Sequence, residues 1–166
     1  MTRESFKILF EKHFDSVRNY IYYRTGDEEL ATDITQETFM LIWEKQLVKS
    51  ENNAAGLIYK IAGNILVSKY RRQQVELKFQ KSISNEQLEY SPEEELQYTE
   101  LHNKYEKAIS DLDEKQRTVF LMSRNDELKY SEIAKRLNIS DKAVEKRMSL
   151  ALAFLKNEMR EFIGKT

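Results

Sequence analysis

The sequence contains no cysteine, so disulfide bonds and thiolate metal sites are excluded. It has only two histidines, His13 and His102, and each stands alone in a helical pattern. We interpret both as packing or surface residues. No Gly-rich phosphate-binding loop and no converging acid and base groups are found. The sequence therefore predicts no catalytic residue, no metal and no cofactor, which disfavours an enzyme.

Turn-forming residues are scarce, since the 166 residues include only four glycines and one proline. With 40% hydrophobic and 33% charged residues, the chain has enough apolar side chains for a core, and the balance favours helices. No apolar run approaches the roughly 18 residues of a membrane span, and the N-terminus lacks a signal-peptide pattern. We expect a cytoplasmic protein with no membrane insertion of its own.

The net charge of -1 conceals an uneven distribution along the chain. Residues 1–73 carry 11 basic and 10 acidic side chains, residues 74–100 carry 2 and 7, and residues 101–166 carry 14 and 11. The acidic excess is therefore confined to the middle. A near-neutral average does not by itself exclude nucleic-acid binding, although a basic surface is its usual sign.

Apolar residues recur every three or four positions in both outer parts of the chain, which is the pattern of amphipathic helices. We predict an all-α fold of two small helical domains, residues 1–73 and 92–166, joined by a flexible acidic linker over 74–91. Helix boundaries are predicted at Gly26, with Asp27 restarting the chain, at Asn53 as an N-cap, and at Ser91-Pro92.

The C-terminal region has the pattern of a helix-turn-helix. A short helix over 131–137 is followed by a turn at 138–140 and a long helix from Asp141 to about Met159. Asn138 suits a left-handed turn position and Ser140 an N-cap. Three apolar residues are predicted to hold the long helix against the short one: Val144, Met148 and Leu152.

The start of that long helix is the predicted DNA-reading surface. Its candidate residues are Ser140, Asp141, Lys142, Glu145, Lys146 and Arg147. Arginine and lysine bind guanine edges or phosphates, and glutamate accepts from the cytosine amino group. A solvated charged face on an ordinary helical hairpin is the alternative interpretation of the same residues.

Segments in both predicted domains resemble extracytoplasmic function (ECF) sigma factors of bacterial RNA polymerase. The C-terminal match comprises Leu112 to Leu121, Tyr130 to Ala134 and Ile139 to Glu145. The N-terminal match runs from Ala31 through Trp43 and from Ile58 to Arg72. Both domains match in the order of the family. The resemblance implies a factor that binds core polymerase, recognises the minus-35 and minus-10 promoter elements and promotes DNA melting.

The resemblance also implies roles for the N-terminal residues. Asp33, Gln36 and Glu37 would dock on the clamp helices of the polymerase beta-prime subunit, and their alternative interpretation is a hydrated helix face. Contacts to the minus-10 element would come from Asn52, Asn53, Lys60, Asn64, Lys69, Arg71 and Arg72, with the two loop asparagines beside a flipped base. Tyr59 and Tyr70 could stack on bases, but packing is the favoured interpretation.

The sequence departs from the family pattern at two positions. Gly63 stands where a basic residue is common, and Ser68 where an aspartate is frequent, so the details of minus-10 recognition are open. The family's linker passes near the RNA exit path, so an RNA-mimicking role for the acidic segment and incidental acidity are both open. The beta flap and an anti-sigma factor are the further partners that the resemblance implies.

A dimeric helix-turn-helix repressor or activator is the principal alternative to a sigma factor. It would bind a symmetric operator as the free protein. A sigma factor would bind DNA weakly until core polymerase is present, which distinguishes the two hypotheses.

Overall fold

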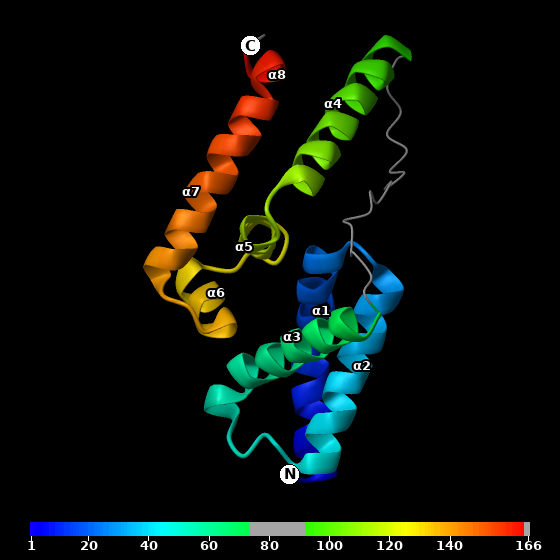
Figure 1. Cartoon of the computed structure of the whole chain (residues 1–166), viewed down its shortest axis with the longest axis vertical. Helices are drawn as coiled ribbons and strands as arrows, with labels where there is room; N and C mark the ends of the chain where they lie inside the picture. The colour runs from blue at the N-terminus through cyan, green and yellow to red at the C-terminus, as the bar shows by residue number, and fades with distance from the viewer. Residues whose placement is uncertain (74–91, 165–166) are drawn as a thin grey trace.

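The computed structural model describes residues 1–73 and 92–164, with the side chains of Glu51, Gln73, Ile163 and residues 92–97 left aside. Within these residues the chain forms eight α-helices and one 3-10 turn, and no strand (Figure 1). The elements are α1 (Arg3–Thr25), α2 (Glu28–Lys45), η1 (Glu51–Asn53), α3 (Ala54–Gln73), α4 (Pro92–Asp111), α5 (Glu114–Arg124), α6 (Tyr130–Leu137), α7 (Asp141–Glu158) and α8 (Arg160–Ile163). The all-α prediction is confirmed.

Helices α1 and α2 lie side by side and α3 packs across them to form the first half of the molecule (Figure 1). Gly26 ends α1 with a φ of 69°, and the Asp27 side chain caps α2 by accepting from the Leu30 backbone N–H. A glycine is favoured at Gly26 because the left-handed conformation is strained for other residues. The core of this half contains fully buried residues, among them Val17, Ile21, Ile34, Ile42, Ile58 and Leu66.

The second half contains α4 to α8, and its helix-turn-helix is α6, the turn and α7 (Figure 1). Asn138 adopts the left-handed conformation with a φ of 54°, and Ser140 caps α7 by accepting from the Ala143 N–H. Both observations confirm the predicted turn. The predicted proline start of α4 is also found, whereas its predicted cap, Ser91, lies outside the described residues.

One packing prediction in the helix-turn-helix is wrong. Leu152 is 49% exposed, and the residues that hold α7 in place are Val144, Met148, Ala151 and Leu155. Their spacing of four, three and four residues keeps them on one helix face. Leu152 lies eight residues after Val144, which rotates it about 80° away from that face.

The two halves contact each other directly. Helix α5 packs on α1, and α6 packs on α3. None of the helices in the described part of the chain is long and apolar enough to cross a membrane.

Candidate polymerase and promoter interfaces

The predicted polymerase-docking residues form one exposed patch on α2. Asp33, Gln36 and Glu37 are all exposed, whereas Ile34, Thr35 and Thr38 are buried on the opposite side. This separation follows from helical periodicity, which places residues three and four apart on the same face. The Glu37 carboxylate accepts from Lys69 Nζ on α3 at 3.1 Å. A predicted polymerase contact and a predicted DNA contact are therefore paired with each other.

An apolar groove that the sequence analysis missed borders this patch. It has a volume of about 520 Å³ and is lined by Arg3, Phe6, Phe10, Gln36, Phe39, Met40 and Trp43. Met40 is 61% exposed and Trp43 is 39% exposed. Exposed apolar surface beside polar residues is typical of a protein interaction site. The sequence signal was the presence of Phe6 and Phe10 on α1 and of Phe39, Met40 and Trp43 on α2, next to the predicted polar patch.

The predicted minus-10 residues are spread along α3 and the turn before it. Asn52 and Asn53 are exposed in η1, and Arg71 and Arg72 are exposed near the other end of the helix. A helix of 20 residues is about 30 Å long, so these groups are separate contacts rather than one cluster. Lys60 and Asn64 share a middle face, which borders a cleft of about 310 Å³ with Arg136, Leu137 and Asn138 on its other side.

Tyr59 is a core residue, as the packing interpretation predicted. Its side chain is 2% exposed, its ring centroid lies 5.0 Å from that of Tyr20, and its hydroxyl accepts from Arg136 at 3.1 Å. Burial raises the pKa of the Tyr59 phenol, so the hydroxyl stays protonated at neutral pH. Tyr70 is half-buried at the end of α3.

Two neighbouring side chains leave little room for a side chain at Gly63. A Cβ at this position would lie 3.2 Å from the Tyr20 hydroxyl and 3.3 Å from Arg24 Nη1. A basic side chain at residue 63 would require both groups to move. The departure from the family pattern therefore leaves room for Arg24.

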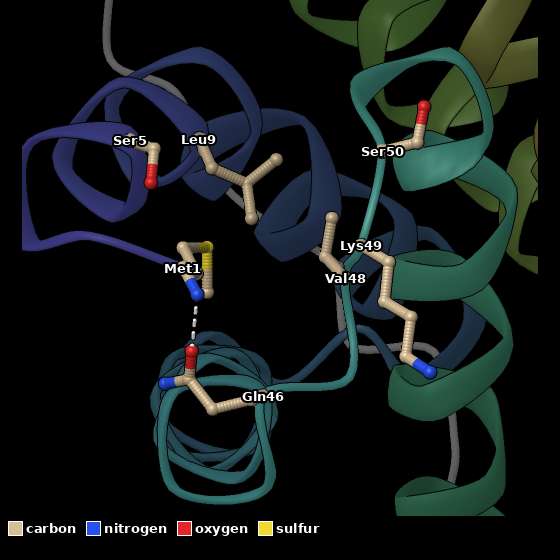
Figure 2. Close-up of a pocket in the computed structure, with 7 residues that line it drawn as sticks. All are labelled: Met1, Ser5, Leu9, Gln46, Val48, Lys49 and Ser50. Atoms are coloured by element: carbon tan, nitrogen blue, oxygen red, sulfur yellow. Dashed lines mark hydrogen bonds between the residues drawn. The ribbon is translucent and has the colours of Figure 1, made fainter.

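A hollow of about 430 Å³ lies between the start of α1 and the loop that connects α2 to α3 (Figure 2). Figure 2 shows Met1, Ser5 and Leu9 on one side and Gln46 and Val48 on the other, with the Met1 amino group donating to the Gln46 side chain. Asn52 and Asn53 do not line it. The loop before α3 was predicted to bind a flipped base. The hollow was not predicted, because it forms only where α1 comes close to this loop.

The predicted DNA-reading residues lie together at the start of α7. Ser140, Asp141, Lys142, Glu145 and Lys146 are exposed, whereas Arg147 is half-buried. Arg147 borders a second cleft together with Arg24 and Glu114. The N-terminal turn of a helix presents side chains to a groove in this kind of motif. The geometry of α6, the turn and α7 is therefore that of a helix-turn-helix.

Sequence profiles of protein families match both halves. The profile described as Sigma-70 region 2 matches residues 9–76, and the profile described as Sigma-70, region 4 matches residues 102–155. The chain belongs to the sigma-70 family. It is an RNA polymerase sigma factor that recognises promoters. Members of this family are transcription regulators rather than enzymes.

Similar proteins place the sigma factor in the ECF group. It is 26% identical to the ferric citrate uptake sigma factor FecI of Escherichia coli, over 89% of this chain and 87% of FecI. It is 28% identical to RNA polymerase sigma factor YlaC of Bacillus subtilis, over 95% and 93%, and 24% identical to ECF sigma factor SigW of the same species, over 96% and 91%.

A solved structure supports the fold. The sigma factor RpoE of Bartonella quintana, determined in complex with the anti-sigma factor NepR, matches with a TM-score of 0.66. The match covers 95% of this chain and 98% of the other at 20% identity. At that identity the likeness is one of fold.

Proposed function

We propose that the first half of this sigma factor, residues 1–73, docks on the polymerase beta-prime clamp helices through Asp33, Gln36 and Glu37 on α2. The observation that carries this proposal is the position of three exposed polar side chains beside the apolar groove lined by Phe10, Met40 and Trp43. An apolar centre with a polar rim is the usual anatomy of a protein interface. The second half, residues 92–166, would contact the beta flap.

We further propose that α3 and the loop before it bind and melt the minus-10 element, while the start of α7 reads the minus-35 element. Lys60, Arg71 and Arg72 supply positive charge for phosphates. Lys142, Lys146 and Arg147 supply the same charge and base contacts on the second half. Because polymerase and promoter DNA lie in the bacterial cytoplasm, we place the protein there.

The substitution Glu37→Lys tests the docking proposal. We expect at least a tenfold loss of affinity for purified core polymerase, since a charge at the centre of a polar contact is reversed. Lys69→Ala is the matched control, because it breaks the ion pair with Glu37 but leaves the carboxylate in place. Glu11→Lys makes the same charge change at an exposed position on α1. Equal binding by Glu37→Lys and Glu11→Lys would contradict the proposal.

Run-off transcription with core polymerase on genomic fragments tests the function as a whole. We expect start sites that depend on this protein. Absence of such sites on every fragment would reject promoter melting by this chain. A dimeric regulator would instead bind a symmetric operator without polymerase.

The hollow in Figure 2 is a candidate receiver for an unstacked minus-10 base. Leu9 and Val48 provide apolar surface, and Ser5 and Gln46 provide hydrogen-bonding groups, which together suit a flipped base. Ser5→Trp would fill the hollow from its rim. We expect slower opening of a promoter labelled with 2-aminopurine at the minus-10 element, and an unchanged rate would exclude this role.

An anti-sigma factor is the remaining partner that we propose. The similar RpoE protein was solved with one, and this chain shares its fold. The RNA-mimicking role concerns five acidic residues whose side chains the structure does not describe: Glu86, Glu89, Glu93, Glu94 and Glu95. Neutralising them and measuring abortive initiation tests that role, which unchanged promoter escape would exclude.

A further inference from the structure

The contact between the two halves is made of specific polar interactions. Arg24 on α1 donates to Glu114 on α5 at 2.6 Å. Asp126, which follows α5, accepts from the Tyr23 hydroxyl at 2.8 Å and from the Asn19 amide at 3.2 Å. These bonds join residues about a hundred positions apart in sequence. Hydrogen bonds that involve a charged group are among the stronger ones in proteins.

Arg117 on α5 completes this contact. The residue is 6% exposed, and its guanidinium donates to the carbonyl oxygens of Tyr23 at 2.9 Å and Arg24 at 3.2 Å. These carbonyls belong to the last turn of α1, where helix carbonyls lack intrahelical partners and the helix dipole favours a cation. The same side chain donates to the Leu112 carbonyl at 3.0 Å. One buried arginine therefore links the end of α1 to the turn before α5.

A second contact lies between α3 and α6. Arg136 donates to the Tyr59 hydroxyl at 3.1 Å, and its guanidinium lies 5.7 Å from the centroid of the Tyr59 ring. A Cβ added at Gly56 would lie 3.3 Å from the Lys135 carbonyl oxygen, so the two helix backbones are in close contact. Lys60 and Asn64 border the cleft beside this contact.

This closed arrangement is too compact for both promoter elements. The names of the elements place them about 25 base pairs apart, which is roughly 85 Å at 3.4 Å per base pair. The helix-turn-helix instead touches α3 directly. The halves must separate before α3 and α7 can occupy their two elements together.

We propose that the interactions of Arg24, Tyr23 and Asn19 with Glu114, Arg117 and Asp126 form a latch that holds the free sigma factor closed and limits its binding to core polymerase. The proposal builds on the sigma function, because it assumes that only the open form engages the polymerase with both halves. A partner that selects a minor open form binds with an affinity reduced by the fraction that is open. Breaking the latch should therefore improve the affinity for core.

The ion pair gives a reversible test by charge exchange. Because the chain has no cysteine, cysteines introduced at the exposed Lys12 and Asn157 can carry a pair of fluorescent dyes. In the full chain, Arg24→Glu and Glu114→Arg should each raise the open fraction about tenfold and so lower energy transfer between the dyes. The double exchange, which puts the opposite charges back together, should restore most of the energy transfer. Asp111→Arg, an exposed position at the end of α4, makes the same charge change as Glu114→Arg and should leave transfer unchanged.

Core binding is the second measurement. Each single exchange should bind core polymerase several-fold more tightly than the parent chain. A substitution that only destabilised the fold would weaken core binding instead. The direction of the change in affinity therefore distinguishes an opened latch from a damaged fold. Unchanged energy transfer in both single exchanges, or no recovery in the double exchange, overturns the latch. Energy transfer needs neither polymerase nor DNA, so failure of the latch is distinguishable from failure of the sigma function.

Milder variants keep the test valid if the charge exchanges fail to fold. Tyr23→Phe removes only the hydroxyl that Asp126 accepts from and should open the chain a few-fold. Gly63→Lys should also open it by displacing Arg24, whereas Gly63→Ala adds one atom that the ends of Tyr20 and Arg24 can accommodate. Equal energy transfer in Tyr23→Phe, Gly63→Lys and the parent chain would likewise reject the latch.

Discussion

The two helices proposed to read promoter DNA differ in their surroundings. Lys142 and Lys146 at the start of α7 are exposed, although Arg147 beside them is half-buried. On α3, Lys60 and Asn64 border a cleft whose other wall is α6 and the turn after it. Lys69 on the same helix is paired with Glu37. The proposed minus-35 residues other than Arg147 are therefore exposed away from the first half, whereas Lys60 and Asn64 are exposed but lie at the border with the second half.

This difference suggests an order of events. The α7 surface can meet duplex DNA before the halves separate, whereas DNA can follow the whole middle of α3 only after α6 has left the cleft beside Lys60 and Asn64. The near-neutral charge of the chain agrees with weak binding by the free protein, since few phosphates would be neutralised at once. Polymerase would then supply the free energy that keeps the halves apart.

The largest expected effect comes from removing the core that supports α7. Ile133 on α6 is fully buried, and α6 packs against α7, so Ile133→Ala should lower the free energy of unfolding by about 2–5 kcal/mol. Binding of a minus-35 duplex should be lost with it. Ile8→Ala is the matched control, because Ile8 is 56% exposed on α1. Urea unfolding followed by circular dichroism measures both, and equal stability of the two variants would contradict the assignment.

The helices and their caps could be predicted from the sequence because they depend on local spacing. Gly26, Asn138 and Ser140 are examples, since each satisfies a backbone requirement that its neighbours define. The contact between the halves could not be predicted. Arg117 lay within a recognisable motif, but its acceptors across the contact are the carbonyl oxygens of Tyr23 and Arg24, more than ninety residues away, and any residue type presents such a carbonyl.

For the same reason, the sequence predicted only part of the geometry around the candidate site. Polar residues on one helix face, such as Asp33, Gln36 and Glu37, follow from periodicity. The apolar groove beside them needs α1 and α2 to meet at a particular angle, and the hollow at Ser5 needs α1 to approach the loop after α2. Leu152 shows the limit of periodicity itself, because one residue of slippage moves a side chain from the core to the surface.

A smaller effect should distinguish the two DNA surfaces in the free protein. Lys146→Ala should weaken binding of a minus-35 duplex and reduce the dependence of log K on log salt by about one, as loss of one phosphate contact does. Lys60→Ala should leave this binding unchanged but lower transcription when core is present. Fluorescence anisotropy at several salt concentrations measures the first effect. Equal loss in both variants would mean that duplex DNA already contacts Lys60 while the chain is closed.

The smallest expected effect is a dependence of closure on pH. Burial raises the pKa of Asp126 above its ordinary value of 3.8, and the bonds from Tyr23 and Asn19 and the charge of Arg136 only partly oppose this shift. The closed form thus binds the proton more tightly than the open form. The resulting stabilisation of the closed form is complete below pH 3.8 and is lost as the pH rises through the raised pKa.

Energy transfer between the dyes at residues 12 and 157 measures this dependence. The closed fraction should fall slightly as the pH rises from about 4 toward neutrality, which is the direction that a raised carboxyl pKa requires. Asp126→Asn keeps the shape of the side chain and cannot titrate, so its closed fraction should vary less over the same range. The prediction is wrong if the closed fraction rises with pH in the parent chain and not in Asp126→Asn. That result would show that the ionised Asp126 carboxylate strengthens the latch.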